Sequence, residues 1–298
     1  MQNEMLLRQT LAKITPRNVQ AESEARARLD ALAKPPGSLG RLEDIAAQLS
    51  GIAGGVPTVA RRTILIFSAD NGVVEEGVAS APKAVTVAQT INFTRGVTGV
   101  AVLARRFGAQ LRVIDIGIDA NLDCPGVIDA KVRRGTGNIA CEDAMTRTEA
   151  MQAVAVGIRQ AQMASETCDI LGLGEMGIGN TTTSSAVLSA LTGLDPDALV
   201  GKGAGLAPGA FDHKKQVVRR ALTRSQPDAT DPVGVMQKVG GLDIAGMAGA
   251  YLGAAAARKP VVIDGFISAV AALCAVRLCP DAAAYMIPSH ASREPGYA

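Results

Sequence analysis

The chain has 298 residues, a formal net charge of +2, 48% hydrophobic residues and only 3% aromatic residues. This length suits one large α/β domain, alone or with a small appendage. Interspersed charge and scarce aromatic side chains argue against nucleic acid or an anionic membrane surface as a partner. The longest apolar segment, residues 244–257, is shorter than the roughly 20 residues of a membrane span, so no membrane association is expected.

The cysteines predict free thiols in a reducing cytoplasm. Their number is odd and none is spaced as Cys-x-x-Cys, and the first residues are too mixed and polar for a signal peptide. With only two histidines in the chain, no metal site is expected. The five cysteines are Cys124, Cys141, Cys168, Cys274 and Cys279.

Two helices are expected at the start of the chain, at residues 4–14 and 19–33. The segment Lys34-Pro35-Pro36-Gly37-Ser38-Leu39-Gly40 then interrupts helix formation, because two prolines and a glycine impose an extended turn. Ser38 could cap a third helix that runs to about residue 50. Read alone, this segment is a helix–helix linker.

From residue 63 onward, strands alternate with helices. Several strands end in Asp or Glu beside glycine, as in Asp70-Asn71-Gly72. This pattern predicts a doubly wound parallel sheet with one cleft at the carboxyl edge of its strands. No dinucleotide-binding or P-loop glycine motif opens the first unit. Strands are expected at 63–67, 111–116, 168–173, 260–263 and 284–287. Helices are expected at 85–107, 146–166 behind a Thr146/Glu149 capping box, 184–191, 212–225 as an amphipathic, basic helix with a solvated face, and 244–257.

The most unusual stretch is residues 171–183, which read as a strand, a glycine-rich turn and a helix N-terminus. Gly174, Gly177 and Gly179 would let the backbone approach a ligand closely, and the amides of the helix that follows suit a phosphate. Asn180 and the threonines after it could cap that helix. The alternative is an ordinary flexible crossover loop.

Other candidates remain open when each is taken alone. Ser80 and Gln89 could face a pocket or serve ordinary loop and surface roles. Lys202, in the glycine-rich loop 200–206, could neutralise a phosphate if it is desolvated. Arg133 and Arg134 could bind phosphate or belong to an exposed basic loop.

Taken together, seven motifs in order resemble one enzyme family, the nicotinate-nucleotide–dimethylbenzimidazole phosphoribosyltransferases of cobalamin lower-ligand synthesis. The resemblance runs from Lys34 to Gly296. It implies a Rossmann-like sheet with a small helical domain built from the termini, with residues 1–33 in the small domain and 34–298 in the large catalytic one. The motifs are residues 34–40, 70–80, 172–182, 200–203, 240–246, 263–266 and 289–290.

The resemblance implies transfer of phosphoribose from nicotinate mononucleotide to 5,6-dimethylbenzimidazole, without a cofactor or metal, by a cytoplasmic homodimer. It places Glu175, Ser80 and, with looser spacing, Gln89 near the benzimidazole. The turn from Gly177 to Thr182 would hold the phosphate, with Lys202 nearby. Glu175 and Lys202 would be catalytic, and the substrate-binding residues would be Ser80, Gln89, Gly174, Met176, Gly177, Ile178, Gly179, Asn180, Thr181, Thr182, Gly203, Asp243, Asp264 and Ser289.

The chain also departs from the family pattern. Family members continue into a C-terminal helical part whose Gly-Glu-Gly motif carries the general base, and residues 1–298 contain no such motif. Spacing also shifts slightly at Pro82 and Lys83. We therefore expect retained nucleotide binding and turnover lowered by ~10²–10⁴-fold, because that is the usual contribution of a positioned base. Two alternatives are a nucleotide- or azole-binding protein without turnover and, more distantly, an NAD-binding oxidoreductase.

Overall fold

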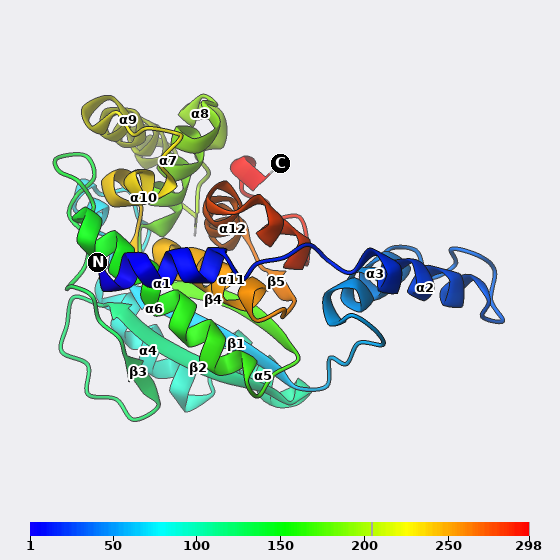
Figure 1. The fold of residues 1–298 in the computed structure, drawn as a ribbon. Helices are drawn as coiled ribbons and strands as arrows, with labels where there is room; N and C mark the ends of the chain where they lie inside the picture. Colours follow the sequence, from blue (N-terminus) through cyan, green and yellow to red (C-terminus); the bar gives the residue numbers. More distant parts are fainter. Residues whose placement is uncertain (204, 298) are drawn as a thin grey trace.

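The computed structural model describes residues 1–203 and 205–297, which contain one six-stranded, all-parallel sheet with helices around it (Figure 1). The strand order is β3-β2-β1-β4-β5-β6, the order of a dinucleotide-binding fold. The expected doubly wound parallel sheet is therefore confirmed. The strands are β1 (Arg62–Ala69), β2 (Ala109–Gly117), β3 (Val127–Asp129), β4 (Ile170–Met176), β5 (Val261–Ile263) and β6 (Met286–Pro288).

The expected helices occur in the expected order, but one of them is divided in two and three further helices were not predicted. The helix expected at 85–107 is two helices, because Gly96 adopts φ +73° and Thr98 caps a new start by accepting from the amide of Ala101. The short α8 and also α10 and α12 were not predicted. The helices are α1 (Gln2–Leu11), α2 (Val19–Asp30), α3 (Arg41–Ala53), α4 (Ala84–Arg95), α5 (Gly99–Phe107), α6 (Arg147–Ser165), α7 (Asn180–Thr192), α8 (Pro196–Leu199), α9 (Pro208–Ser225), α10 (Pro232–Val239), α11 (Leu242–Ala256) and α12 (Phe266–Leu278), with 3₁₀ turns η1 (Gly72–Glu76), η2 (Pro280–Tyr285) and η3 (Pro295–Tyr297).

Three cap predictions have different outcomes. The capping box of α6 is confirmed, since Thr146 and Glu149 bond reciprocally. The Ser38 prediction is wrong, because Gly40 precedes the first turn of α3. Asn180 does not cap α7 either. Gly179 holds that position with φ +92°, a conformation that favours glycine, and this frees the Asn180 side chain for another task.

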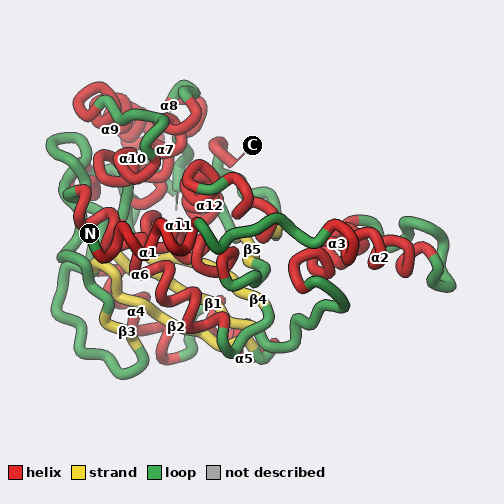
Figure 2. The backbone as a smooth tube through the Cα atoms, in the orientation of Figure 1, coloured by secondary structure: helices red, strands yellow, loops and turns green. Residues whose placement is uncertain are grey.

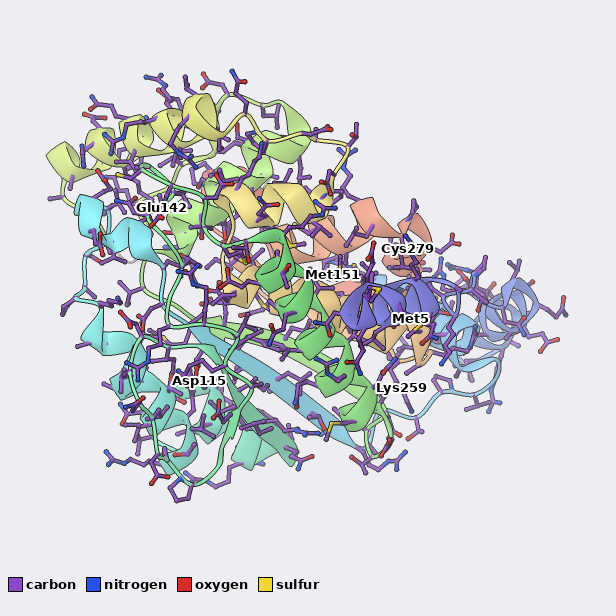
Figure 3. The ribbon with its side chains drawn as sticks, turned by 60° about the vertical axis from the view of Figure 1, so that its left-hand side comes forward. Met5, Asp115, Glu142, Met151, Lys259 and Cys279 are labelled. Atoms are coloured by element: carbon purple, nitrogen blue, oxygen red, sulfur yellow. The ribbon has the colours of Figure 1, made fainter. Side chains whose placement is uncertain are left out.

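One face of the sheet is covered by α6 and α11, which pack closely against each other and over β1 and β4. A Cβ on Gly157 of α6 would come within 1.8 Å of the carbonyl oxygen of Gly246 on α11, and one on Gly249 within 2.0 Å of Val154 O. The two helix backbones therefore touch directly. Figure 3 shows α1 beside α6, on the outside of this layer.

The opposite face carries α4 and α5 beside β1 and β2. Figures 1 and 2 show α2 and α3 as an arm that projects from the body. The helices of this arm pack on each other, and Gln48 of α3 donates to the carbonyls of Ala284 and Met286. The division of the chain at residues 33 and 34 stays a prediction. Among the residues that the structure describes, no helix has the length and apolar character needed to cross a membrane.

Candidate functional site at the switch point of the sheet

The sheet changes direction between β1 and β4, which are neighbours although β2 and β3 separate them in sequence. Their register pairs Ser68 with Met176, so both strands end at the same level. In open α/β sheets the ligand crevice lies beyond the carboxyl ends of the strands at such a point. The loop from Asp70 and the turn from Gly177 therefore border the expected cleft.

A carboxylate pair lies at this edge. Glu175 is the penultimate residue of β4, and Asp243 lies in the first turn of α11. The Asn180 side-chain amide joins them, because its Nδ2 lies 2.5 Å from Glu175 Oε2 and 2.9 Å from Asp243 Oδ2. The remaining oxygen of Asp243 accepts from the Ile244 amide at 3.0 Å.

Both acids are easier to protonate than usual. Loss of water around Glu175, with the nearby charge of Asp243, raises its pKa to about 7, although Asn180 opposes the change. Asp243 is fully buried, and burial raises its pKa to about 6 against the opposing hydrogen bond from Asn180. Around neutral pH the pair can therefore accept or release a proton, which a general base must do.

A buried lysine lies on the other side of the first turn of α7. Lys214 of α9 is 1% exposed, and its Nζ donates to Thr181 Oγ1 at 2.8 Å and to the carbonyl oxygen of Gly201 at 3.0 Å. Glu294 accepts from the amide of Gly203 at 3.1 Å. We call these five residues the lysine cluster. Burial lowers the pKa of Lys214 to about 8, and the charge of Glu294 opposes that change.

Sequence reasoning missed Lys214 and named Lys202 instead. Lys202 is exposed, with its Nζ 6.0 Å from the ring centre of Phe211, so the expected desolvated lysine of the glycine loop is not this residue. Residues 212–225 lie in α9, which has the expected exposed basic side with Arg219, Arg220 and Arg224, and a buried side that carries Lys214. Phe211, Lys214 and Val218 follow each other at helical spacing on the apolar side of α9, and that periodicity is the signal that could have identified the lysine.

The turn before α7 is already tied to its neighbours. The Ile178 amide donates to Thr86 Oγ1 on α4 at 3.3 Å, and the Asn180 and Thr182 amides donate to the carbonyls of Gly177 and Gly179. Thr86 is a second residue that sequence reasoning missed. A Cβ on Gly177 would lie 2.7 Å from both Ala69 O and Asp243 Oδ2, so only glycine fits there.

A cavity of about 960 Å³ brings four of the predicted site residues together, namely Gly174, Glu175, Asp264 and Ser289. From this polar end it continues along the face of β1, β4, β5 and β6 that α6 and α11 leave free. Gly174 of β4 lies against Ile66 of β1, because a Cβ on this glycine would come within 2.7 Å of Ile66 Cδ1.

Other candidate residues predicted from the sequence do not line this cavity. Ser80 is exposed in the loop before α4, and Gln89 is half-buried on α4, where it accepts from Asn92. Arg133 pairs with Glu149 and Arg134 with Asn121, so the arginine loop is tied into the fold. Across residues 1–203 and 205–297, no group of three or more His, Cys, Asp or Glu side chains could hold a metal ion.

The fold and this edge define a Rossmann-like α/β protein with a proton-accepting acid pair and a buried cation on either side of one helix N-terminus. A family model described as phosphoribosyltransferase matches residues 14–298. The chain belongs to the nicotinate-nucleotide–dimethylbenzimidazole phosphoribosyltransferase family, whose members include its relatives at about 50% identity.

The relative of that name from Ruminiclostridium cellulolyticum is 50% identical over 294 residues, which are 98% of this chain and 84% of the relative. The relative from Yersinia enterocolitica is 48% identical over 288 residues, 96% of this chain and 82% of its own length. The crystal structure of CobT from Thermus thermophilus superposes with a TM-score of 0.90 at 40% identity, covering 93% of this chain and 84% of that one.

Proposed function

We propose that this protein transfers phosphoribose from nicotinate mononucleotide to 5,6-dimethylbenzimidazole, releasing nicotinate and α-ribazole 5′-phosphate. The observation that carries the proposal is the position of Glu175. Burial raises the pKa of its carboxyl group to about 7, and this group lines the cavity at the carboxyl edge of the sheet. It accepts from Asn180, and the next residue, Thr181, accepts from the buried Lys214. The names of the relatives supply the two substrates.

In the reaction a benzimidazole nitrogen forms a bond to C1′ of the ribose. The bond from C1′ to the nicotinate nitrogen breaks on the opposite face, and its electron pair neutralises the pyridinium ring. The second benzimidazole nitrogen must then lose its proton, which Glu175 can accept and pass to water. A pyridinium is a good leaving group, so the demands on the protein are to orient the two rings and remove one proton.

We propose that the phosphate binds at the lysine cluster, between Thr181, Lys214 and the Gly203 amide. The carboxylate of Glu294 at the Gly203 amide supports an anion position there, because the same amide would suit a phosphate oxygen that takes the place of this carboxylate. Asp243, Asp264 and Ser289 would then line the ribose and nicotinate end of the cleft. Ser80 and Gln89 would border the benzimidazole from the side of α4.

A turnover assay tests the proposal directly. The purified chain is incubated with both substrates, and nicotinate release is followed by chromatography and the new phosphate ester by ³¹P NMR. We expect both products in equal amounts, and a Glu175→Gln variant should be slower by ~10²-fold or more. Calorimetry with nicotinate mononucleotide separates the alternatives: binding without products from a properly folded chain would support a binding protein instead.

We also propose a cytoplasmic homodimer. All five cysteines are free, which suits a reducing compartment. The apolar cavity along the sheet and the exposed Leu39 and Leu42 of the arm are surfaces that a second copy would cover. Sedimentation equilibrium should give twice the chain mass, and Leu42→Asp should shift the protein toward monomer. A monomer at every concentration would refute the dimer.

A further inference from the structure

Asn180 was expected to contact substrate, but its side chain is already committed to the protein. Its Nδ2 has two hydrogens, and the structure places one carboxylate oxygen within hydrogen-bond distance for each of them. Asn180 is buried at the start of α7. Since Gly179 takes the capping position, the Asn180 side chain points back toward β4 and α11 and not along its own helix.

We propose that Asn180 is a positioning residue: its amide clamps Glu175 and Asp243 into one acid pair and fixes the Glu175 carboxyl group toward the cavity. The proposal rests on the proposed function only in its effect on the turnover rate; the effect on carboxyl titration does not depend on that function. The clamp brings together groups from three elements, β4, α7 and α11. Without the amide, two carboxylates would face each other with no donor between them.

The charges around Glu175 and Asp243 determine whether loss of the Asn180 amide raises or lowers the pKa of the pair. Asp264 after β5 acts on Glu175, and Asp70 after β1 acts on Asp243, and both make ionisation harder. Among the positive charges around these acids, Lys83 acts on Asp70 and pairs with Asp119, and Lys214 donates to Thr181, the residue after Asn180. The side-chain amide of Asn180 favours the ionised form of both acids, and the backbone amide of Ile244 favours that of Asp243 as well. Removing the Asn180 amide should therefore raise the upper pKa of the Glu175 and Asp243 pair.

The first test needs no substrate. Carboxyl titration of the free protein by ¹³C NMR should show two coupled steps, with the upper one near pH 7. In Asn180→Ala this upper step should move up by about one pH unit, a tenfold gain in proton affinity. In Asp243→Asn, an isosteric change, it should move down. In the double variant the upward shift caused by losing Asn180 should be under half as large, because there is no second charge to clamp.

The second test is the pH dependence of turnover. The acid limb of kcat/KM should move with the titration in Asn180→Ala, while KM for nicotinate mononucleotide at high pH stays within about threefold. Ser189→Ala is the control, because Ser189 is also on α7 and the change removes a partly buried 2.7 Å hydrogen bond to Leu194 O; it should leave both profiles in place.

Each other outcome overturns the proposal. If Asn180→Ala raised the upper titration step equally in the wild-type chain and in Asp243→Asn, Asn180 would act on Glu175 alone. A large rise in KM with an unmoved acid limb would make Asn180 a substrate ligand. If the wild-type chain shows no turnover, the proposed function fails, but the titration series still decides the clamp.

Discussion

Replacement of Lys214 by methionine is the sharpest test of where the phosphate binds. Methionine fills nearly the same volume but removes the charge and both hydrogen bonds of the ammonium group, which is 1% exposed. A hydrogen bond to a charged group contributes about 1.5–3 kcal/mol. At about 1.4 kcal/mol per tenfold, Lys214→Met should weaken binding of nicotinate mononucleotide by roughly 10- to 150-fold.

The assay is calorimetric binding of the mononucleotide together with KM at saturating dimethylbenzimidazole. Lys202→Met is the matched control, because this lysine is exposed in the adjacent glycine loop, and its effect should stay below about threefold. Lys214→Met also leaves the buried Gly201 carbonyl oxygen without its donor, which costs about 1–3 kcal/mol of stability, so binding is measured well below the melting temperature of the variant. A larger loss in Lys202→Met than in Lys214→Met would refute the reasoning.

Three further predictions concern stability and pH. Gly177→Ala should lose about 1–3 kcal/mol in denaturant unfolding, because its Cβ meets Ala69 O at 2.7 Å, whereas Gly209→Ala, with open space around it, should change little. Burial raises the pKa of Asp243 to about 6, so its contribution to stability is present below about pH 4 and is lost as pH rises through 6. Asp243→Asn should therefore gain on the order of 2 kcal/mol relative to wild type between pH 4 and pH 8 in urea melts. Burial lowers the pKa of Lys214 to about 8, so kcat/KM for the mononucleotide should fall as pH rises through 8 and the ammonium group loses its charge. A wild-type pH profile as flat as that of Lys214→Met would contradict this.

The sheet and the order of its elements could be predicted because apolar runs such as 63–67 and 111–116 end in polar, glycine-containing turns. The short β3 could not, since three residues in a polar loop carry too little periodicity. The break between α4 and α5 could have been predicted from Gly96-Val97-Thr98, because glycine at a helix end followed by a threonine cap is a recognised stop and start signal.

At the site, the local sequence identified Glu175 but ended its strand at residue 173, whereas β4 runs to Met176 and carries Gly174 and Glu175 within it, with Gly177 directly after the strand. It could not show what Asn180 touches, since Asp243 lies 63 residues further along the chain. It also favoured Lys202, because that lysine is next to glycines in sequence. Burial is set by which face of α9 packs inward, and on that criterion Lys214 is the enclosed one.

The direct backbone contact of α6 with α11 limits how this protein can be engineered. Exchanging helical glycine for alanine is a common way to raise melting temperature, since alanine restricts the unfolded chain. At Gly157 and Gly249 there is no room for even a methyl group, so the routine exchange would push apart the layer that supports β1 and β4. A thermostable variant must be sought on other helices.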